Sequence, residues 1–96
     1  MALTILAQIT AIKGQEALVR GELEKLIAPT LAEQGCLQYD LHVDNDHDGF
    51  FVFYETWETR ALWQAHMNAP HLAAYLVATK DVVEKFTVTE MTKVKG

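Results

Sequence analysis

The segment that most constrains the fold is residues 50–57, FFVFYETW, in which aromatic and β-branched side chains occupy both odd and even positions. Such a segment is typical of a central strand, because both of its faces need to be covered by protein. Residues 3–12, LTILAQITAI, are apolar at almost every position and predict a second strand of this kind. We therefore expect a sheet that is covered on both sides.

A helix is expected between these two strands, over residues 15–34. Gly35 follows it as a stop signal. Pro29 lies inside the segment and cannot donate a hydrogen bond to the carbonyl of Lys25, so we expect a kink or a change of axis there. The apolar residues that recur at helical spacing are Val19, Leu23, Leu26, Ile27 and Leu31.

Residues 37–43 follow, and their apolar positions alternate with polar ones, which is typical of an edge strand with one apolar face. Cys36, the only cysteine, is expected to be a small residue that opens this strand, and it excludes an internal disulfide. A polar turn over residues 44–49 should join the strand to the central one.

The last third of the chain predicts a second helix in two pieces and a final strand. Thr59 is a suitable N-cap for a helix that ends near Asn68. Pro70 suits the first turn of a further helix over residues 70–85. Apolar and polar residues alternate again over residues 86–95, which indicates a strand.

The resulting order, β-α-β-β-α-β, predicts a ferredoxin-like α+β fold in a single domain spanning residues 1–96. Its antiparallel sheet carries the helices on one side only, so the other side is left open. A lone chain of this length buries only about 60–65% of the surface that its unfolded form exposes. We expect the open side to be covered by a second copy related by a two-fold axis, which makes the protein a homodimer.

Charge and hydropathy exclude several classes of partner. The formal net charge is −5, and the eight Lys and Arg residues are scattered, so nucleic acid is not an expected partner. No run approaches the roughly 20 apolar residues of a membrane helix, and no basic segment precedes an apolar stretch at the start. We expect a cytoplasmic protein with no membrane partner.

One metal motif occurs in the chain, because Asp44, Asp46, Asp48, Gly49 and Glu55 match the spacing of a calcium-binding EF-hand loop. An EF-hand loop joins two helices, whereas the segments on either side here predict strands. We therefore expect a solvated acidic hairpin and no metal site.

Two histidines are candidates for a general base. His66 lies at the centre of the apolar arc of its predicted helix, so its imidazole should face the sheet. His71 shares an arc with Tyr75 and would sit in a first helical turn, where the helix dipole favours the neutral base. The alternative is that both are core or interface histidines that hydrogen-bond to backbone carbonyls.

Glu55 shares a strand face with Phe53 and Trp57. A carboxylate among aromatic rings is either an acid or base with a raised pKa, or the partner of a buried cation, and a pair with His66 would serve both interpretations. The aromatic residues around it are either core residues or the walls of a flat slot for an aromatic ligand; they are Phe53, Trp57, Trp63 and Tyr75.

The order of motifs resembles that of the antibiotic biosynthesis monooxygenase family through nearly the whole chain. The resemblance rests on GCLQYDLHVD after the first helix, then FVFYETWET, then ALWQAH followed by APH. The spacing of Glu55 to Trp57 and of His66 to His71 is similar to the branch that resembles quinol monooxygenases.

This resemblance implies a dimeric α+β barrel with a pocket in each subunit between the sheet and its helices. It also implies the oxidation of a quinol- or anthrone-like small aromatic by molecular oxygen, with no bound cofactor. In that chemistry a base removes a proton, the resulting anion passes an electron to oxygen, and the two radicals combine. His66 or His71 would be the base, with Glu55 beside them.

Three alternatives bear on function. Haem-degrading relatives carry an Asn and a His where this chain has Ile9 and Leu76, which disfavours haem degradation. A relative that isomerises a phosphorylated signalling molecule would need cationic phosphate donors, which this acidic chain largely lacks. The remaining alternative is a non-catalytic dimer of the same fold, either binding small apolar molecules or acting as a stress-associated protein.

Overall fold

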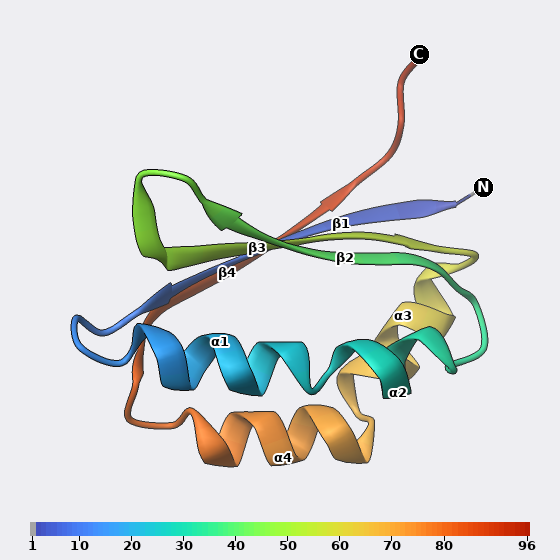
Figure 1. Cartoon of the computed structure of the whole chain (residues 1–96). Coiled ribbons are helices and arrows are strands. Elements are labelled where there is room, and N and C mark those ends of the chain that lie inside the picture. The colour runs from blue at the N-terminus through green and yellow to red at the C-terminus, as the bar shows by residue number, and fades with distance from the viewer. Residues whose placement is uncertain (1) are drawn as a thin grey trace.

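The computed structural model describes residues 2–96. Its four strands form one antiparallel sheet in the order β2-β3-β1-β4, and four helices lie on one side of that sheet (Figure 1). The elements along the chain are β1 (Leu3–Ala11), α1 (Glu16–Glu24), α2 (Ile27–Leu31), β2 (Cys36–Asp44), β3 (His47–Trp57), α3 (Arg60–Met67), α4 (Pro70–Ala78) and β4 (Val83–Met91). This arrangement confirms the ferredoxin-like α+β fold, with β1 and β3 central and β2 at an edge.

The two faces of β3 differ in burial, although the sequence of this strand is apolar on both. Phe51, Phe53 and Trp57 are buried beneath the helices. On the opposite face, Val52 is half-buried and Tyr54 is 41% exposed, because no helix covers that side. Within one chain, therefore, only one of the two apolar faces of β3 is covered, and the other is open.

The open face is more mixed than the apolar pattern suggests. Leu6 of β1 pairs with Tyr54 of β3, which leaves an apolar centre. Polar side chains flank it and bond to one another: Thr56 Oγ1 donates to Gln38 Oε1 at 3.0 Å, and Thr87 Oγ1 donates to Gln8 Oε1 at 3.1 Å. A partner on this face would meet an apolar centre with a polar rim.

The helix predicted over residues 15–34 is two helices, with the break at Lys25 and Leu26. Pro29 explains why the first helix does not continue, because it lacks the N–H that would bond to the Lys25 carbonyl. Lys25 and Leu26 connect the two helices, and α2 then runs from Ile27 to Leu31.

The prediction of a helix over residues 70–85 was wrong at its end, since α4 stops at Ala78. Thr79 follows it, and its hydroxyl donates to the Tyr75 carbonyl at 2.8 Å. The carbonyl of Val82 accepts a hydrogen bond from the Ile12 amide, and β4 pairs with β1 from Val83 onwards. Strand pairing with β1 thus displaces the last helical turn, and β4 ends at Met91 rather than at residue 95.

Two details of β2 also differ from the simple alternation. Leu37 lies in a bulge between the pairs Cys36–Trp57 and Gln38–Thr56, so it is 59% exposed while Tyr39 is buried. The polar turn is shorter than residues 44–49, because β3 already begins at His47.

The acidic hairpin has the strand flanks that were expected. The Asp46 amide donates to Asp44 Oδ1 at 2.8 Å, which closes the tight turn. Glu55 is buried near the far end of β3, away from this turn, so the spacing of the calcium motif does not bring its ligands together. Within residues 2–96, no helix has the length and hydropathy needed to span a membrane.

Candidate active site

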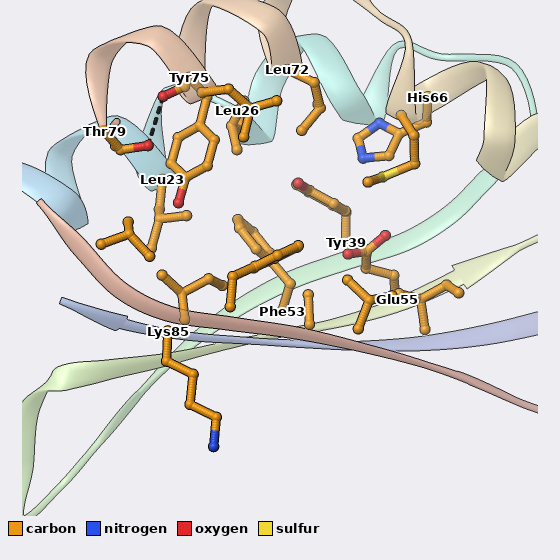
Figure 2. A pocket seen from close by; sticks show the side chains of 18 of the residues that line it. Leu23, Leu26, Tyr39, Phe53, Glu55, His66, Leu72, Tyr75, Thr79 and Lys85 are labelled. Carbon is orange, nitrogen blue, oxygen red and sulfur yellow. Dashed lines mark hydrogen bonds between the residues drawn. The ribbon is translucent and has the colours of Figure 1, made fainter. Parts of the chain in front are cut away.

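A cavity of about 330 Å³ lies between the sheet and the helices (Figure 2). Its walls are mainly aliphatic and aromatic, and its size is near the lower end of the roughly 300–1,000 Å³ that is usual for small-molecule sites. Five of the seven residues singled out from the sequence line it: Phe53, Glu55, Trp63, His66 and Tyr75. Trp57 and His71 do not line it. Trp57 hydrogen-bonds to Glu55, and His71 hydrogen-bonds to Glu33, which also contacts His66.

His66 reaches the cavity from α3. The Thr59 hydroxyl accepts a hydrogen bond from the Leu62 amide at 3.1 Å, which confirms Thr59 as the N-cap and sets the start of this helix. Trp63 and His66 follow at a spacing of three, so both face the sheet. Only 2% of His66 is exposed, which confirms the inward orientation expected from the helical wheel.

Glu33 bridges the two candidate histidines. Its Oε2 atom lies 2.6 Å from Nδ1 of His66 and 2.8 Å from Nε2 of His71. Because a carboxylate only accepts hydrogen bonds, each of these ring nitrogens carries the donated proton. In neutral His66, Nε2 is therefore the unprotonated nitrogen, and the structure gives it no hydrogen bond to residues 2–96.

The sequence interpretation missed Glu33, which follows α2 and whose side chain is 18% exposed. It lies near the end of the first helical region, where the apolar stripe has ended. The only available signal was that two inward histidines on neighbouring helices require a partner. Glu55 had been the candidate partner of His66, with backbone carbonyls as the alternative for both histidines; the carboxylate of Glu33 takes that role instead.

The His66 ring packs between two aromatic residues. Its centroid lies 4.7 Å from the Trp57 ring and 5.5 Å from the Tyr39 ring. Burial lowers the pKa of His66, while the hydrogen bond and charge of Glu33 act in the opposite direction. His66 is therefore held as a neutral base, and the imidazolium that forms when it takes a proton lies beside a carboxylate and an electron-rich indole ring.

Glu55 does not pair with His66, so that part of the sequence interpretation was wrong. Its Oε1 atom accepts a hydrogen bond from Trp57 Nε1 at 2.9 Å. The two residues stand on the same face of β3, two positions apart, where an indole N–H and a carboxylate meet directly. Burial raises the pKa of Glu55 to about 7; the bond from Trp57 opposes this shift and the charge of Glu33 adds to it.

Tyr39 is a second residue of the site, which the sequence interpretation counted only among the apolar positions of the strand over residues 37–43. Its ring stacks on Phe53 with the centroids 4.3 Å apart. Figure 2 shows its hydroxyl directed towards the helices, on the side of the cavity where His66 lies, and the residue lines the cavity. Burial raises the pKa of this phenol, so it is a neutral hydrogen-bonding group.

Besides Glu55, the charged residues that line the cavity are Lys80, Glu84 and Lys85. The Lys85 side chain extends away from the cavity, beyond the sheet (Figure 2). Ile9 and Leu76, the two positions compared with haem-degrading relatives, both line the cavity and are aliphatic. Tyr39, Glu55 and His66 thus lie together at one end of a mainly apolar interior, and the Tyr75 hydroxyl lies at the other end (Figure 2).

Comparison with known proteins places this geometry in a family. Residues 2–78 match the family model described as antibiotic biosynthesis monooxygenase. The probable quinol monooxygenase YgiN of Escherichia coli K12 is 34% identical over 93 residues, covering 85% of this chain and 89% of YgiN. An uncharacterised Synechocystis protein, sll1783, is 29% identical over 62 residues, and the match spans 42% of its length.

Solved structures agree with the sequence matches. PA3566 from Pseudomonas aeruginosa superposes with a TM-score of 0.94 at 32% identity, covering 98% of this chain and 95% of that one. Rv0793 from Mycobacterium tuberculosis superposes with a TM-score of 0.91 at 25% identity, covering 100% of this chain and 98% of that one.

Proposed function

The chain belongs to the antibiotic biosynthesis monooxygenase family, and we propose that it oxidises a quinol- or anthrone-like aromatic with molecular oxygen and no bound cofactor. One observation carries this proposal. A buried histidine, His66, is oriented by Glu33 so that its free nitrogen is available at the end of an apolar cavity. That arrangement suits the removal of a proton from a flat, weakly acidic aromatic substrate.

The first step is proton abstraction by Nε2 of His66. The substrate lies between Phe53 and the aliphatic residues of the helices, with its acidic O–H or C–H bond directed towards the imidazole. Glu33 retains the hydrogen bond to Nδ1 throughout, so it fixes the tautomer and stabilises the imidazolium. The apolar walls exclude water and keep the substrate anion electron-rich.

The second step is electron transfer from this anion to oxygen, followed by combination of the two radicals to form a peroxide on the substrate carbon. Glu55 is the proton donor to that peroxide, because a carboxyl with a pKa of about 7 is partly protonated at neutral pH. For an anthrone, two C–H bonds break, one oxygen atom becomes the new carbonyl, and the other leaves as water. The substrate supplies all the electrons that oxygen accepts.

We also propose that the protein works as a homodimer through the open face of its sheet. The fold of this family is commonly dimeric. The apolar centre around Leu6, Val52 and Tyr54, with its polar rim of Gln and Thr side chains, has the composition of a protein interface. The catalytic cavity lies on the opposite side of the sheet, so dimerisation leaves it open.

Two alternatives are less well supported. Isomerisation of a phosphorylated molecule needs several cations inside the cavity. Two lysines line it, Lys80 and Lys85, and the Lys85 side chain extends away from it (Figure 2), which leaves Lys80 alone. A non-catalytic binding protein needs no base, yet here a buried imidazole is held in one tautomer beside a carboxyl group of raised pKa.

The decisive experiment measures oxygen consumption by the purified protein with a panel of hydroquinones, naphthoquinols and anthrones. We expect turnover of at least one class above its autoxidation rate, with incorporation of one atom of ¹⁸O₂ into the product. The matched control is His66→Ala, assayed at equal concentration of folded protein. Rates equal to autoxidation for every compound would overturn the proposal.

A further inference from the structure

The two histidines and the carboxylate behind the cavity have the composition of a metal-binding site. Nδ1 of His66, Nε2 of His71 and Oε2 of Glu33 all lie within 4.8 Å of one another. They come from α3, from the first turn of α4 and from the segment after α2, so three separate elements fix their positions. Two imidazoles and one carboxylate are a common ligand set for zinc, with one position left for water.

We propose that Glu33, His66 and His71 form a binding site for a divalent transition ion such as Zn²⁺, and that its occupation blocks His66 as a base.

Coordination requires small movements of all three side chains, because the two ring nitrogens, which lie within 4.8 Å of each other, have to come to about 3.3 Å. Ligand atoms around tetrahedral zinc lie about 3.3 Å apart, given bonds of about 2.0–2.2 Å. The present N···O separations of 2.6 and 2.8 Å are hydrogen bonds, so Glu33 Oε2 needs to withdraw by a few tenths of an ångström. The Glu33 and His71 side chains are 18% and 21% exposed, which provides both room for this movement and a route for the ion.

The local charge also favours a cation. Among residues 2–96, the ion pairs of Glu33 are with the two histidines, and no Lys or Arg lies within reach of its carboxylate. A divalent ion replaces the two donated protons and compensates the carboxylate directly.

Metal binding has a specific consequence for the base. A metal at Nδ1 of His66 uses the lone pair of that nitrogen, and the proton of the neutral ring then resides on Nε2. Nε2 is the atom that the proposed function requires to be free, so a bound ion removes the proton acceptor from the cavity without entering it. This inhibitory role rests on the proposed function, whereas metal binding itself does not.

The test of binding is a calorimetric titration of the full, tag-free chain with Zn²⁺ in a buffer that does not chelate it. We expect one ion per chain and a tetrahedral absorption spectrum when Co²⁺ replaces zinc. His71→Ala and Glu33→Gln should each weaken binding by at least the roughly 10–100-fold that loss of an outer-shell partner costs. Thermal melts of the metal-free variants establish that they are folded.

His47→Ala is the matched control, because His47 lies in the acidic hairpin at the start of β3. It should bind zinc as the wild type does. Unchanged affinity in His71→Ala and Glu33→Gln, or loss of binding in His47→Ala, would overturn the assignment of the site.

Inhibition is measured separately, on quinol oxidation by the wild type with and without saturating zinc. We expect zinc to lower the wild-type rate at least tenfold. Zinc should not lower the rate of His71→Ala below the rate of the same variant without zinc. Zinc binding without inhibition would overturn the inhibitory role. If the protein oxidises no quinol, the proposed function fails, while the titration still decides whether the metal site exists.

Discussion

Nδ1 of His66 lies 2.6 Å from Oε2 of Glu33, although the two residues are 33 positions apart in the chain. The contact joins α3 to the segment after α2 and fixes the tautomer of the one imidazole that lines the cavity. It also sets the balance between burial, which disfavours the imidazolium, and a carboxylate, which favours it. The chemical behaviour of the site therefore depends on a residue outside the cavity.

Replacement of His66 by Ala tests the base directly. We expect turnover to fall by roughly 10²–10⁴-fold, because that is the usual contribution of a general base. The substitution also leaves a small cavity and removes the partner of Glu33, which should cost about 1–3 kcal/mol of stability. The measurement combines kcat with the melting temperature, so that loss of chemistry is separated from loss of folded protein.

His71→Ala is the parallel variant, since His71 bonds to Glu33 but does not line the cavity. Its effect on turnover should be smaller than that of His66→Ala. Unchanged turnover in a folded His66→Ala protein would end the catalytic assignment of His66.

Glu33→Gln tests whether the carboxylate tunes the base. The amide oxygen still accepts the bond from Nδ1, but the negative charge is removed. Since that charge raises the pKa of His66, its loss should lower this pKa further. We expect the acid limb of the kcat profile to move to lower pH and the plateau rate to fall, because the weaker base accepts protons less readily.

The control for this variant is Glu24→Gln, which removes one carboxylate from an exposed position on α1. It should leave the pH profile in place. A profile that is the same in Glu33→Gln and wild type would show that Glu33 has only a structural role.

Much of the fold follows from local patterns in the sequence. The period-two and helical apolar patterns identify every strand and helix, and Pro29 marks the break in the first helical region. The ends of elements are predicted wrongly where strand pairing competes with local preference. Val83 pairs with β1 as part of β4, and α4 therefore ends early. A helical wheel cannot contain that information, because the competing partner lies more than 70 positions away.

The site shows the same division. The inward orientation of His66 was predicted from its own helix, because residues three or four positions apart lie on the same helical face. Glu33 was missed because its partners lie on other helices and its own position carries no local signal. The bond between Glu55 and Trp57 could have been predicted, since residues two apart on a strand share a face and a buried indole N–H needs an acceptor.

The stability of Glu55→Gln, measured relative to wild type, should be greater at pH 8 than at pH 5. The folded protein holds the Glu55 proton up to a pKa of about 7, whereas the unfolded chain releases it near 4.5. The contribution of Glu55 to the free energy of unfolding is therefore fully present below about pH 4.5 and is lost as the pH rises through 7.

The neutral amide abolishes this loss and still accepts the Trp57 bond. We expect the stability of Glu55→Gln relative to wild type to rise by on the order of 2–3 kcal/mol between pH 5 and pH 8, measured by urea unfolding. The contribution of His66 is common to both proteins and cancels. Glu58→Gln, on an exposed residue just beyond β3, should show no such change, and an equal response from the two variants would refute the assignment.

Val52→Lys tests the dimer at the centre of the open face. Val52 pairs with Gln8 of β1 and with His42 of β2, so it lies in the middle of the surface that we propose to be covered by a second copy. A lysine there would lose its hydration against the same residue of the partner, and two like charges would meet near the two-fold axis. We expect sedimentation at micromolar concentration to give twice 10.8 kDa for wild type and 10.8 kDa for the variant.

Leu18→Lys, at a 44% exposed position of α1 on the helical side, should remain a dimer. A Val52→Lys protein that sediments with the wild type would place any dimer interface elsewhere on the molecule.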